Sequence, residues 1–404
     1  MNSIVIVGGG QAGTQSAVSL RRLGYEGSII IIGEEAYPPY QRPPLSKDYL
    51  LDKTQLERVY LKKEIFYKEN KIDLILNTKV ESINREDKSV SLSDKQIITY
   101  DKLIIATGSR VRKLEVPGIK KNGVHYLRGL EDANKLKTDL KNKKKLVIVG
   151  AGYIGLEVAA VARTLGLKTS IIDIAERAMS RTVDPFISNY YRSLHEKNGV
   201  TFFFEHRLES INGGKAIEQV LCNNGLKLNA DMAVIGAGVI PNDILASDSG
   251  LICDNGIVVN EYGQTEDIHI YACGDCTNHP NKILERKLRL ESVHNAMEQS
   301  KAVASSLMGQ KEPYNQVPWF WSDQYDHKLQ IVGLSGDHDE VLTRKSKSKE
   351  SFLLFYMKNK KLIAVNAVNS SKEFLISKKL VAKRDIINPD FLIDPSFDLN
   401  ELLV

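Results

Sequence analysis

The stretch Ile4-Val5-Ile6-Val7-Gly8-Gly9-Gly10-Gln11-Ala12-Gly13 decides the fold. Its four apolar residues predict a buried strand, and the glycines that follow have the spacing G-x-G-x-x-G at the start of a predicted helix. Glycines in these three places permit a tight turn, the approach of a pyrophosphate to backbone N–H groups, and close contact between helix and strand. The stretch therefore predicts a strand–turn–helix unit that binds a dinucleotide.

A second copy of this pattern begins 142 residues further along, in Leu146-Val147-Ile148-Val149-Gly150-Ala151-Gly152-Tyr153-Ile154-Gly155. Each copy is completed by an acidic residue at the end of the next predicted strand, Glu34 in the first and Asp173 in the second. A carboxylate at that place binds the hydroxyl pair of a ribose. A glycine turn without a ligand is the alternative for each copy taken alone. Two copies on one chain favour a flavoprotein that receives electrons from a nicotinamide dinucleotide.

The composition is that of a globular protein with more than one domain. A chain of 404 residues is too long for one ordinary core, so two or three domains are expected. Apolar residues make up 42% of the chain and charged residues 26%, and no apolar run is long enough to span a bilayer. The first predicted strand starts directly after Met1, which leaves no room for a signal or transit peptide. We therefore expect a cytoplasmic protein.

The chain has four cysteines, too few for a disulfide scaffold at this length. Cys273 and Cys276 form a C-x-x-C pair, which is the spacing of a redox-active dithiol. They flank Gly274-Asp275, and the packing of small residues around that dipeptide is the favoured interpretation.

Basic residues are concentrated near the C-terminus, although the net charge is only +5. Between Val341 and Arg384 there are twelve basic residues and two acidic ones, which leaves an excess of ten positive charges. The basic residues are Arg344, Lys345, Lys347, Lys349, Lys358, Lys360, Lys361, Lys372, Lys378, Lys379, Lys383 and Arg384. A field of one sign raises the rate of encounter with an acidic partner. An ordinary solvated face is an equal alternative, and nucleic acid is a weaker one because aromatic residues are not interleaved.

The order of predicted strands indicates an α/β fold in which one Rossmann-like domain is inserted in another. The first domain is predicted over residues 1–115 and 239–319, and the inserted domain over 116–238. Residues 320–404 contain short strands separated by polar turns, typical of an antiparallel meander. Ser370, with Glu373 three residues later, resembles a capping box that opens a helix towards Lys383. A small C-terminal α+β domain is therefore expected.

Further motifs give nearly the whole chain a resemblance to a known family. The most specific is Pro38-Pro39-Tyr40-Gln41-Arg42-Pro43-Pro44-Leu45-Ser46-Lys47, similar to P-Y-x-R-P-P-L-S-K in that family. The others are Ala106-Thr107-Gly108, Ile235-Gly236-Ala237-Gly238 before Pro241-Asn242, Tyr271-Ala272-Cys273-Gly274-Asp275, Arg289-Leu290-Glu291-Ser292-Val293 with Asn295-Ala296, and Pro318-Trp319-Phe320-Trp321-Ser322-Asp323-Gln324. With these motifs the chain resembles the FAD- and NADH-dependent ferredoxin reductases that serve oxygenases and P450 systems, the putidaredoxin reductase type. They are relatives of apoptosis-inducing factor within the glutathione reductase fold.

The resemblance implies an FAD site in the first domain. Glu34 would bind the adenosine ribose, the backbone from Gly8 to Gly13 the pyrophosphate, and Asp275 the ribityl chain, although a turn aspartate is the alternative for Asp275 alone. Arg42 and Lys47 would be cations beside the anionic cofactor. The residues expected to hold FAD are Gly8, Gly10, Gln11, Ala12, Gly13, Glu34, Arg42, Lys47, Val80, Ala106, Thr107, Gly108, Arg128, Asp275, Val293 and Trp321.

The resemblance also implies an NADH site in the inserted domain. The residues expected there are Gly150, Gly152, Tyr153, Ile154, Gly155, Asp173, Gly236 and Gly238. Asp173 favours NADH because a carboxylate would repel the additional phosphate of NADPH. Arg177 lies near enough in the sequence to leave the strictness of this preference open.

Four residues are expected to act at the flavin: Lys47, Glu157, Tyr153 and Trp321. Lys47 and Glu157 would form an ion pair beside flavin N5, worth less than about 1 kcal/mol if it is exposed. An ordinary acid in the first turn of a helix is the alternative for Glu157. Tyr153 matches an aromatic residue that gates nicotinamide access in the family. Trp321 would stack near the flavin or shield it, with a core tryptophan at a domain junction as the alternative.

The loop of residues 33–60 contains no cysteine. Disulfide reductases of this fold carry a cysteine pair there, and NADH oxidases and peroxidases carry one, so electrons must leave this flavin directly.

The resemblance implies that NADH gives a hydride to FAD and that single electrons pass to a small acidic [2Fe–2S] ferredoxin, with the basic C-terminal face as its landing site. Another acceptor (rubredoxin, a quinone or oxygen) and a redox-sensing scaffold in the manner of apoptosis-inducing factor are alternatives. No metal site or nucleic-acid partner is expected, and the expected form is a monomer or weak homodimer.

Overall fold

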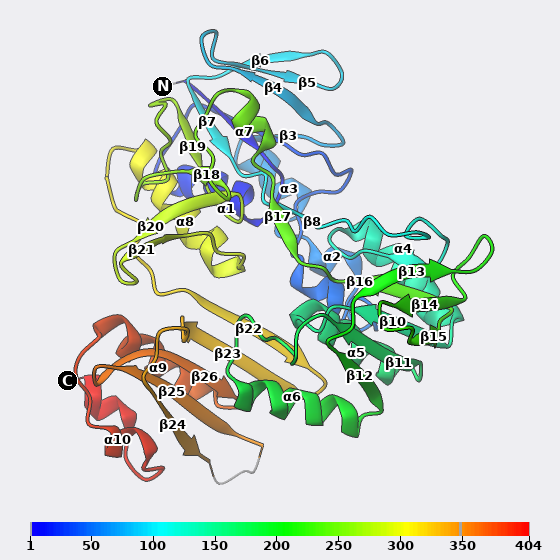
Figure 1. Ribbon diagram of the computed structural model, residues 1–404. Helices are drawn as coiled ribbons and strands as arrows, with labels where there is room; N and C mark the ends of the chain where they lie inside the picture. Colours follow the sequence, from blue (N-terminus) through cyan, green and yellow to red (C-terminus); the bar gives the residue numbers. More distant parts are fainter. Residues whose placement is uncertain (1, 347–349, 404) are drawn as a thin grey trace. The chain divides into compact units, whose positions relative to one another are not determined.

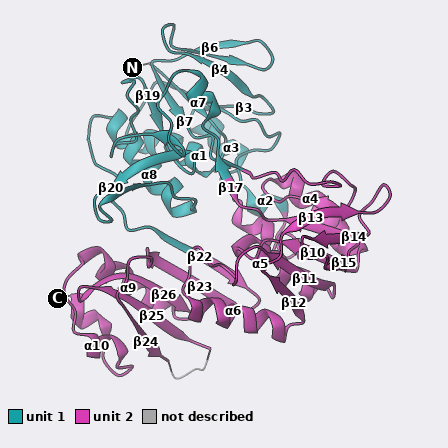
Figure 2. Cartoon of the chain, in the orientation of Figure 1, with its two compact units in different colours: residues 1–41, 56–110, 240–320 teal, residues 42–55, 111–239, 321–404 magenta. Residues whose placement is uncertain are grey.

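The computed structural model describes residues 2–346 and 350–403 (Figure 1). The chain forms two compact units (Figure 2). Unit 1 contains residues 1–41, 56–110 and 240–320, and unit 2 contains residues 42–55, 111–239 and 321–404. Two segments of unit 2 are therefore inserted in unit 1, and a third follows it.

A parallel sheet of five strands, in the order β19-β7-β1-β2-β3, forms the centre of unit 1. The strands are β1 (Ser3–Val7), β2 (Ser28–Ile32), β3 (Ile72–Ile75), β7 (Lys102–Ile105) and β19 (Ile270–Ala272). β1 pairs in parallel with β2 on one side and with β7 on the other. The central strand β1 is therefore hydrogen-bonded along both edges, and its carboxyl end carries the first glycine turn.

The apolar run of β1 is divided between two cores because successive side chains point to opposite faces. Ile4 and Ile6 belong to one buried cluster, and Val5 and Val7 to the other. The helices α1 (Gln11–Arg22) and α8 (Val293–Leu307) pack on the first face. The remaining elements of unit 1 are α2 (Leu56–Val59), α3 (Glu64–Glu69), β4 (Val80–Asn84), β5 (Ser89–Leu92), β6 (Ile97–Thr99), α7 (Ile244–Asp248), β18 (Ile257–Val258), β20 (Thr277–Asn281) and β21 (Arg286–Leu288). β8 (Ser109–Val111) and β17 (Val239–Pro241) lie where the chain passes between the units.

Unit 2 contains a second parallel sheet of five strands, in the order β12-β11-β10-β16-β9. The strands are β9 (Val124–His125), β10 (Lys145–Val149), β11 (Lys168–Asp173), β12 (Val200–Phe204) and β16 (Met232–Ile235). The other elements of this part are η1 (Pro43–Ser46), α4 (Leu130–Asn142), α5 (Tyr153–Thr164), α6 (Pro185–Lys197), β13 (Leu208–Asn212), β14 (Gln219–Cys222) and β15 (Lys227–Asn229). The central strand β10 leads into the second glycine turn, as β1 does in unit 1.

The C-terminal part of unit 2 is a five-stranded sheet in the order β22-β23-β26-β25-β24. The strands are β22 (Trp319–Gln324), β23 (His327–Gly333), β24 (Glu340–Lys345), β25 (Phe352–Lys358) and β26 (Lys361–Val368). The pairs β23–β26, β26–β25 and β25–β24 are antiparallel. α9 (Ser371–Lys383), α10 (Pro389–Ile393) and η2 (Leu399–Leu403) follow the sheet.

These sheets confirm the predicted fold class of two Rossmann-like parts and a C-terminal antiparallel sheet. Residues 111–239 and 321–404 lie in one unit, which also takes in residues 42–55. The division into three domains with the predicted boundaries stays a prediction. Among the described residues, no helix is both long enough and apolar enough to cross a bilayer.

The predicted capping box at Ser370 is wrong, although the helix predicted to follow it is present as α9. Ser370 is the N-cap residue, but its side chain makes no capping bond. Its hydroxyl instead lies 2.7 Å from that of Ser351 and donates to the carbonyl oxygen of Val368 at 3.2 Å. The hydroxyl therefore joins the strands that precede α9.

The assignment of Arg344 to a basic docking face is also wrong. Its side chain is only 7% exposed. Its guanidinium donates to carbonyl oxygens of the C-terminal segment, at 2.7 Å for Phe397 and 3.3 Å for Phe391. Burial lowers the pKa of this guanidinium. Arg344 therefore ties α10 and the residues after it to β24.

Replacing Arg344 by Met should loosen the C-terminal segment, because it leaves buried carbonyl oxygens without a donor. We expect Arg344→Met to lower the free energy of unfolding by about 2–4 kcal/mol, measured by chemical denaturation. Limited proteolysis should then cut after residue 385 more readily. The neighbouring exposed Lys345→Met is the matched control and should change neither. Equal stability of the two variants would contradict the role of Arg344 in holding the C-terminal segment against β24.

Candidate functional site

Each glycine fingerprint forms the turn between a central strand and a helix, β1 to α1 and β10 to α5. The first glycine of each turn has a positive φ, +120° at Gly8 and +108° at Gly150. A Cβ atom at Gly8 would lie 2.2 Å from the carbonyl oxygen of Ala106, and one at Gly150 would lie 2.3 Å from that of Gly236. Backbone conformation and close approach therefore both require glycine at these two positions.

The third glycine of each fingerprint is required by the turn itself. A Cβ atom at Gly13 would lie 2.0 Å from the carbonyl oxygen of Gly8, and one at Gly155 would lie 2.1 Å from that of Gly150. Each helix therefore begins against its own turn.

The middle glycines, Gly10 and Gly152, are in a different situation. A Cβ atom at either would meet nothing within 4 Å. Their φ values of −96° and −78° are open to any residue. The fold does not require glycine here, and an added methyl group would occupy open space at the helix N-terminus. Such a gap is what a pyrophosphate lying against the backbone needs.

The N-termini of α1 and α5 suit an anion. Neither N-cap residue makes a side-chain capping bond, and neither helix has an acidic residue in its first turn. The first N–H groups of a helix have no partner within it, and the helix dipole favours negative charge there. Both turns therefore fit the pyrophosphate of a dinucleotide. Gln11 begins α1, and the buried side chain of Ala12 packs in the core of unit 1.

The two acidic residues lie at the strand ends predicted for them, in different surroundings. Glu34 follows β2 and is exposed. Asp173 ends β11, and its carboxylate accepts bonds from the backbone N–H groups of Ala151 at 2.6 Å and Ala175 at 2.8 Å. Each carboxylate oxygen can accept a further bond. Asp173 therefore orders the second glycine turn, and its carboxylate can still accept hydrogen bonds from the hydroxyl groups of a ribose.

Arg177 is held by the loop that follows it. Its guanidinium donates to the carbonyl oxygens of Val183 at 2.8 Å and Ser180 at 3.0 Å. These bonds hold the guanidinium against the backbone of its own loop, and the strictness of the preference for NADH stays a prediction.

Two family motifs of unit 1 meet at the carboxyl end of its sheet. The Thr107 hydroxyl donates to the carbonyl oxygen of Asn242 at 2.6 Å, and the Asn242 amide donates to that of Thr107 at 2.9 Å. Asp275 accepts a bond from the hydroxyl of Ser109 at 2.8 Å. Gly108, between these residues, has a φ of +67°. The structure thus brings Ala106-Thr107-Gly108 and Asp275 together in one unit.

Two further residues predicted to hold FAD lie in unit 1. Val80 points into the core, so only its backbone is open to a ligand. Val293 is the first residue of α8.

Four residues predicted to hold FAD belong to unit 2: Arg42, Lys47, Arg128 and Trp321. The guanidinium of Arg42 donates to the backbone carbonyl oxygen of Arg128 at 2.8 Å. Trp321 is partly buried in β22. The residues expected at the flavin therefore come from segments of unit 2 that are far apart in sequence.

The predicted ion pair between Lys47 and Glu157 is present. The Lys47 Nζ lies 2.9 Å from Glu157 Oε1. The pair is not exposed, because the Glu157 side chain is only 4% accessible and that of Lys47 17%. The hydroxyl of Ser46 also donates to Glu157, to Oε2 at 2.5 Å. The value for an exposed pair therefore does not apply, and loss of one partner would leave a buried charge uncompensated.

Tyr153 and Ile154 open α5 beside the second glycine turn. Tyr153 is partly buried, and desolvation raises the pKa of its phenol well above the ordinary value. Ile154 is 41% exposed. Gly238, predicted for the same site, has a φ of +88°. The phenol stays neutral at all ordinary pH values, so Tyr153 offers an uncharged aromatic side chain.

The cysteines of the C-x-x-C pair are packing residues. Both side chains are fully buried and both are free thiols. Burial raises the pKa of Cys273 and raises that of Cys276 to about 12. The thiolate is the reactive species, and it is disfavoured at both positions.

Sequence reasoning gave no role to two serines that bind Glu157. Ser46 precedes Lys47 directly, and Ser322 follows Trp321; the Ser322 hydroxyl donates to Glu157 Oε1 at 2.6 Å. Ser322 and Gln324 alternate along β22, and both are completely buried. Two polar residues at alternate positions of one strand face indicate a buried polar network. This pattern is visible in the sequence.

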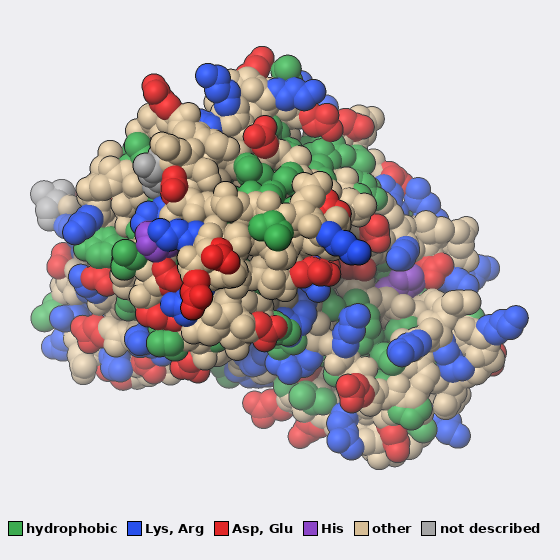
Figure 3. All heavy atoms as spheres, turned by 90° about the horizontal axis from the view of Figure 1, so that it is seen from above, with side chains coloured by type: hydrophobic (Ala, Val, Ile, Leu, Met, Phe, Trp, Pro, Cys, Tyr) green, Lys and Arg blue, Asp and Glu red, His purple; other side chains and the backbone are tan. Residues whose placement is uncertain are grey.

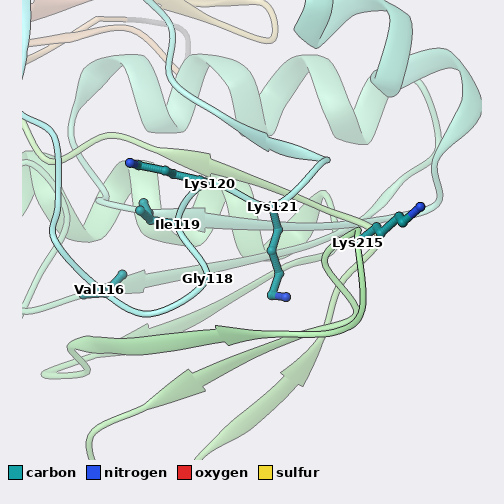
Figure 4. A pocket seen from close by; sticks show the side chains of 6 residues that line it. All are labelled: Val116, Gly118, Ile119, Lys120, Lys121 and Lys215. Atoms are coloured by element: carbon teal, nitrogen blue, oxygen red, sulfur yellow. The ribbon is translucent and has the colours of Figure 1, made fainter.

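A separate open depression in unit 2 is lined by Val116, Gly118, Ile119, Lys120, Lys121 and Lys215 (Figure 4). The Lys121 ammonium group donates to the carbonyl oxygens of Gly213 and Gly214, both at 2.7 Å. None of the predicted site residues lines this depression.

The difference between the middle and third glycines predicts different outcomes of the same substitution. Gly152→Ala should fold normally but raise the Michaelis constant for NADH about tenfold or more, because the methyl group fills the space expected for the pyrophosphate. Gly155→Ala should instead lower the melting temperature, because its Cβ would collide with the carbonyl of Gly150. Steady-state kinetics measures the effect expected of Gly152→Ala, and thermal denaturation measures the effect expected of Gly155→Ala. Unchanged NADH kinetics in Gly152→Ala would contradict the site.

Comparisons with known proteins agree with this geometry. The sequence model of the pyridine nucleotide-disulphide oxidoreductase family matches residues 2–300, and that of the reductase C-terminal domain matches residues 319–403. Rhodocoxin reductase of Rhodococcus erythropolis is 41% identical over 399 residues, which cover 98% of this chain and 93% of that protein. A rubredoxin–NAD(+) reductase of Pseudomonas putida is 39% identical over 371 residues, which cover 92% of this chain and 96% of that protein. The crystal structure of the covalent putidaredoxin reductase–putidaredoxin complex matches with a TM-score of 0.96 and 39% identity, covering 100% of this chain and 98% of that chain.

The predicted resemblance to reductases of the putidaredoxin reductase type is confirmed by these matches over the full chain. FAD and NADH are the cofactors, in agreement with two glycine turns that each leave room for a dinucleotide. The chain is an oxidoreductase that belongs to the pyridine nucleotide-disulphide oxidoreductase family.

Proposed function

We propose that this chain passes electrons from NADH through FAD to a small acidic [2Fe–2S] ferredoxin. The observation that carries the proposal is a pair of glycine turns, each open at its middle glycine, on a chain without a reactive thiol beside them. When bound, FAD accepts a two-electron hydride and yields electrons singly, which an iron–sulfur cluster requires. The solved complex of a related reductase with putidaredoxin supports a ferredoxin as the acceptor.

The chain's own residues would position the two dinucleotides and set the local charge. Glu34 and Asp173 would bind the two adenosine riboses, and Asp275 the ribityl chain of FAD. Lys47, held by Glu157, would stand beside the flavin ring, where an ammonium group stabilises the negative charge that a hydride brings. No side chain has to act as a nucleophile or general base.

Rubredoxin is the second candidate acceptor, because a rubredoxin–NAD(+) reductase is nearly as similar to this chain as the other relatives. Reduction of purified ferredoxin and rubredoxin by the same preparation, at equal concentrations, decides between them. A cytoplasmic location and a monomeric or weakly dimeric form stay predictions.

The lysines near the C-terminus that the structure describes do not form one patch. Lys345 pairs with Phe352 at one end of the β24–β25 ladder, whereas Lys358 and Lys361 lie at the hairpin at its other end. Glu340 pairs with Met357 close to that hairpin, so charges of both signs meet there. Lys347 and Lys349 lie outside the described residues. Figure 3 draws the molecule from above, and basic and acidic side chains are interspersed on that face.

The exposed side of α9 is a more uniform basic surface. Lys372 and Lys379 are exposed and lie seven residues, or about two helical turns, apart on the same side of the helix. Leu375, between them on the same side, is 62% exposed. Cations around an exposed apolar residue suit an acidic protein that also buries apolar surface. We therefore place the ferredoxin contact on this side of α9.

Removing the charge of Asp173 should weaken discrimination against NADPH. We expect Asp173→Asn to raise the Michaelis constant for NADH about tenfold and to lower that for NADPH, with bound FAD unchanged. Asn is preferred to Ala because its amide oxygen keeps one acceptor for the N–H of Ala151. The measurement is steady-state kinetics with both nucleotides. Unchanged kinetics with both would count against this site.

Reversing charge on α9 should weaken ferredoxin binding. Lys372→Glu with Lys379→Glu should raise the Michaelis constant for ferredoxin about tenfold at low salt and flatten its salt dependence, because steering depends on the local field. The matched control is Lys360→Glu with Lys361→Glu, which makes the same charge change at the hairpin and should have little effect. NADH oxidation with ferricyanide should be normal in both. Equal effects of the two pairs would show that net charge matters and α9 does not.

A further inference from the structure

A chain of polar side chains extends from Glu157 into the C-terminal part of unit 2. Ser322 donates to Glu157 Oε1 at 2.6 Å, and the amide nitrogen of Gln324 donates to Ser322 Oγ at 3.2 Å. The amide oxygen of Gln324 lies 2.9 Å from Nε2 of His195. The hydroxyl of Tyr325 lies 3.4 Å from Nδ1 of the same ring.

The interior of this chain is closed to solvent. The side chains of Ser322, Gln324 and His195 are 0% exposed, and that of Glu157 is 4% exposed. A buried polar group without a hydrogen-bond partner costs free energy, so each side chain of this network needs the hydrogen bond to the next one.

The direction of every hydrogen bond follows from the ionised Glu157. A carboxylate only accepts, so Ser322 gives it its one hydrogen and must itself accept from Gln324. Gln324 therefore turns its nitrogen to Ser322 and its oxygen to His195. His195 must then carry its proton on Nε2, which leaves Nδ1 to accept from Tyr325. All the donors thus point towards Glu157.

This arrangement orients the carboxylate and does not conduct protons. A proton passing along it would have to cross the Gln324 amide, which would require the unstable imidic acid tautomer. Burial also lowers the pKa of His195 to about 4, so the imidazole stays neutral near pH 7.

The two oxygens of Glu157 have different partners. Oε2 accepts from Ser46, whereas Oε1 accepts from both Lys47 and Ser322. Ser322 therefore fixes the oxygen that Lys47 uses. The terminal torsion of a glutamate is broad, so the carboxylate can rotate when this bond is removed.

We propose that Ser322 is a positioning residue, held by Gln324 and His195, that fixes the Glu157 carboxylate and through it the Lys47 ammonium group. This inference rests on the proposed place of Lys47 beside the flavin. A strand of the C-terminal sheet would thereby set the position of a charge that acts in hydride transfer.

A double-mutant cycle tests the proposal in the FAD-loaded protein. Ser322→Ala should slow flavin reduction by NADH about tenfold, followed by stopped-flow absorbance, and change the dissociation constant for NADH less than about twofold. Ser322→Thr keeps the hydroxyl and should restore the rate to within about threefold of the original. Because Ser322 acts through Lys47, its substitution should have less than about a twofold effect in the Lys47→Met background.

Two further measurements exclude a merely structural effect. The flavin midpoint potential should fall in Ser322→Ala, because Glu157 loses a donor and its negative charge is less compensated. Ser377→Ala removes another buried hydroxyl of the C-terminal part, one that donates to the carbonyl oxygen of Glu373 at 2.7 Å. This control should change neither the rate nor the potential.

The direction of the network is tested without any activity measurement. Nitrogen-15 labelling of histidine, with His195 assigned by comparison with His195→Gln, should show its proton on Nε2 at pH 7. A proton on Nδ1 would overturn the proposal even if Ser322→Ala does not fold.

The outcomes separate this proposal from the one on which it rests. If Lys47→Met leaves flavin reduction unchanged, Lys47 has no role at the flavin and both proposals are overturned. If Lys47→Met slows reduction while Ser322→Ala does not, or if the two effects are independent, only the positioning role is overturned.

Discussion

Both nucleotide sites depend on a backbone contact that only glycine permits. The N–H of Gly8 donates to the carbonyl oxygen of Ile32 at 2.8 Å, while its Cα faces the carbonyl of Ala106 on the other side. Gly150 repeats this arrangement, with the N–H donating to Ile172 at 2.8 Å and the Cα against Gly236. A Cβ atom would force the neighbouring strands apart at the point where the helix begins. The same constraint therefore orders the sheet and leaves the N-terminus of the helix open to a pyrophosphate.

Charge at the proposed flavin site depends on a different constraint, which is that the buried carboxylate of Glu157 needs hydrogen-bond donors. Glu157 is almost inaccessible, yet it has three donors: Ser46, Lys47 and Ser322. Desolvation of such a group is costly, and these donors together offset that cost. They come from residues 42–55 and from β22, so the pair depends on segments that the chain contributes separately to unit 2. A strand far away in sequence can thus control the geometry of a lysine near the N-terminus.

The sequence predicted best what is encoded locally. Each glycine turn is fixed by residues within about ten positions, so both turns, their strands and their helices could be predicted from composition and spacing. The Lys47–Glu157 pair was expected only because of a resemblance, since nothing local joins two residues that far apart. The alternation of Ser322 and Gln324 in the sequence indicates a polar face of β22, but their partners Glu157 and His195 could not be predicted, because these residues meet only in the folded chain. Arg344 shows the opposite error: it counted as surface charge in the sequence, but its guanidinium is buried against carbonyl oxygens.

The lack of a reactive thiol beside the nucleotide turns decides how electrons leave the flavin. The four cysteines are free; Cys273 and Cys276 are fully buried, and burial raises the pKa of Cys253 to about 11. The most direct measurement is the visible spectrum of the purified protein, treated with an alkylating agent and kept without oxygen, before and after NADH and then a [2Fe–2S] ferredoxin. We predict a yellow protein that NADH bleaches, whose colour returns with the ferredoxin, and which alkylation does not affect. A colourless protein that does not take up FAD, or bleaching that alkylation abolishes, would contradict the account.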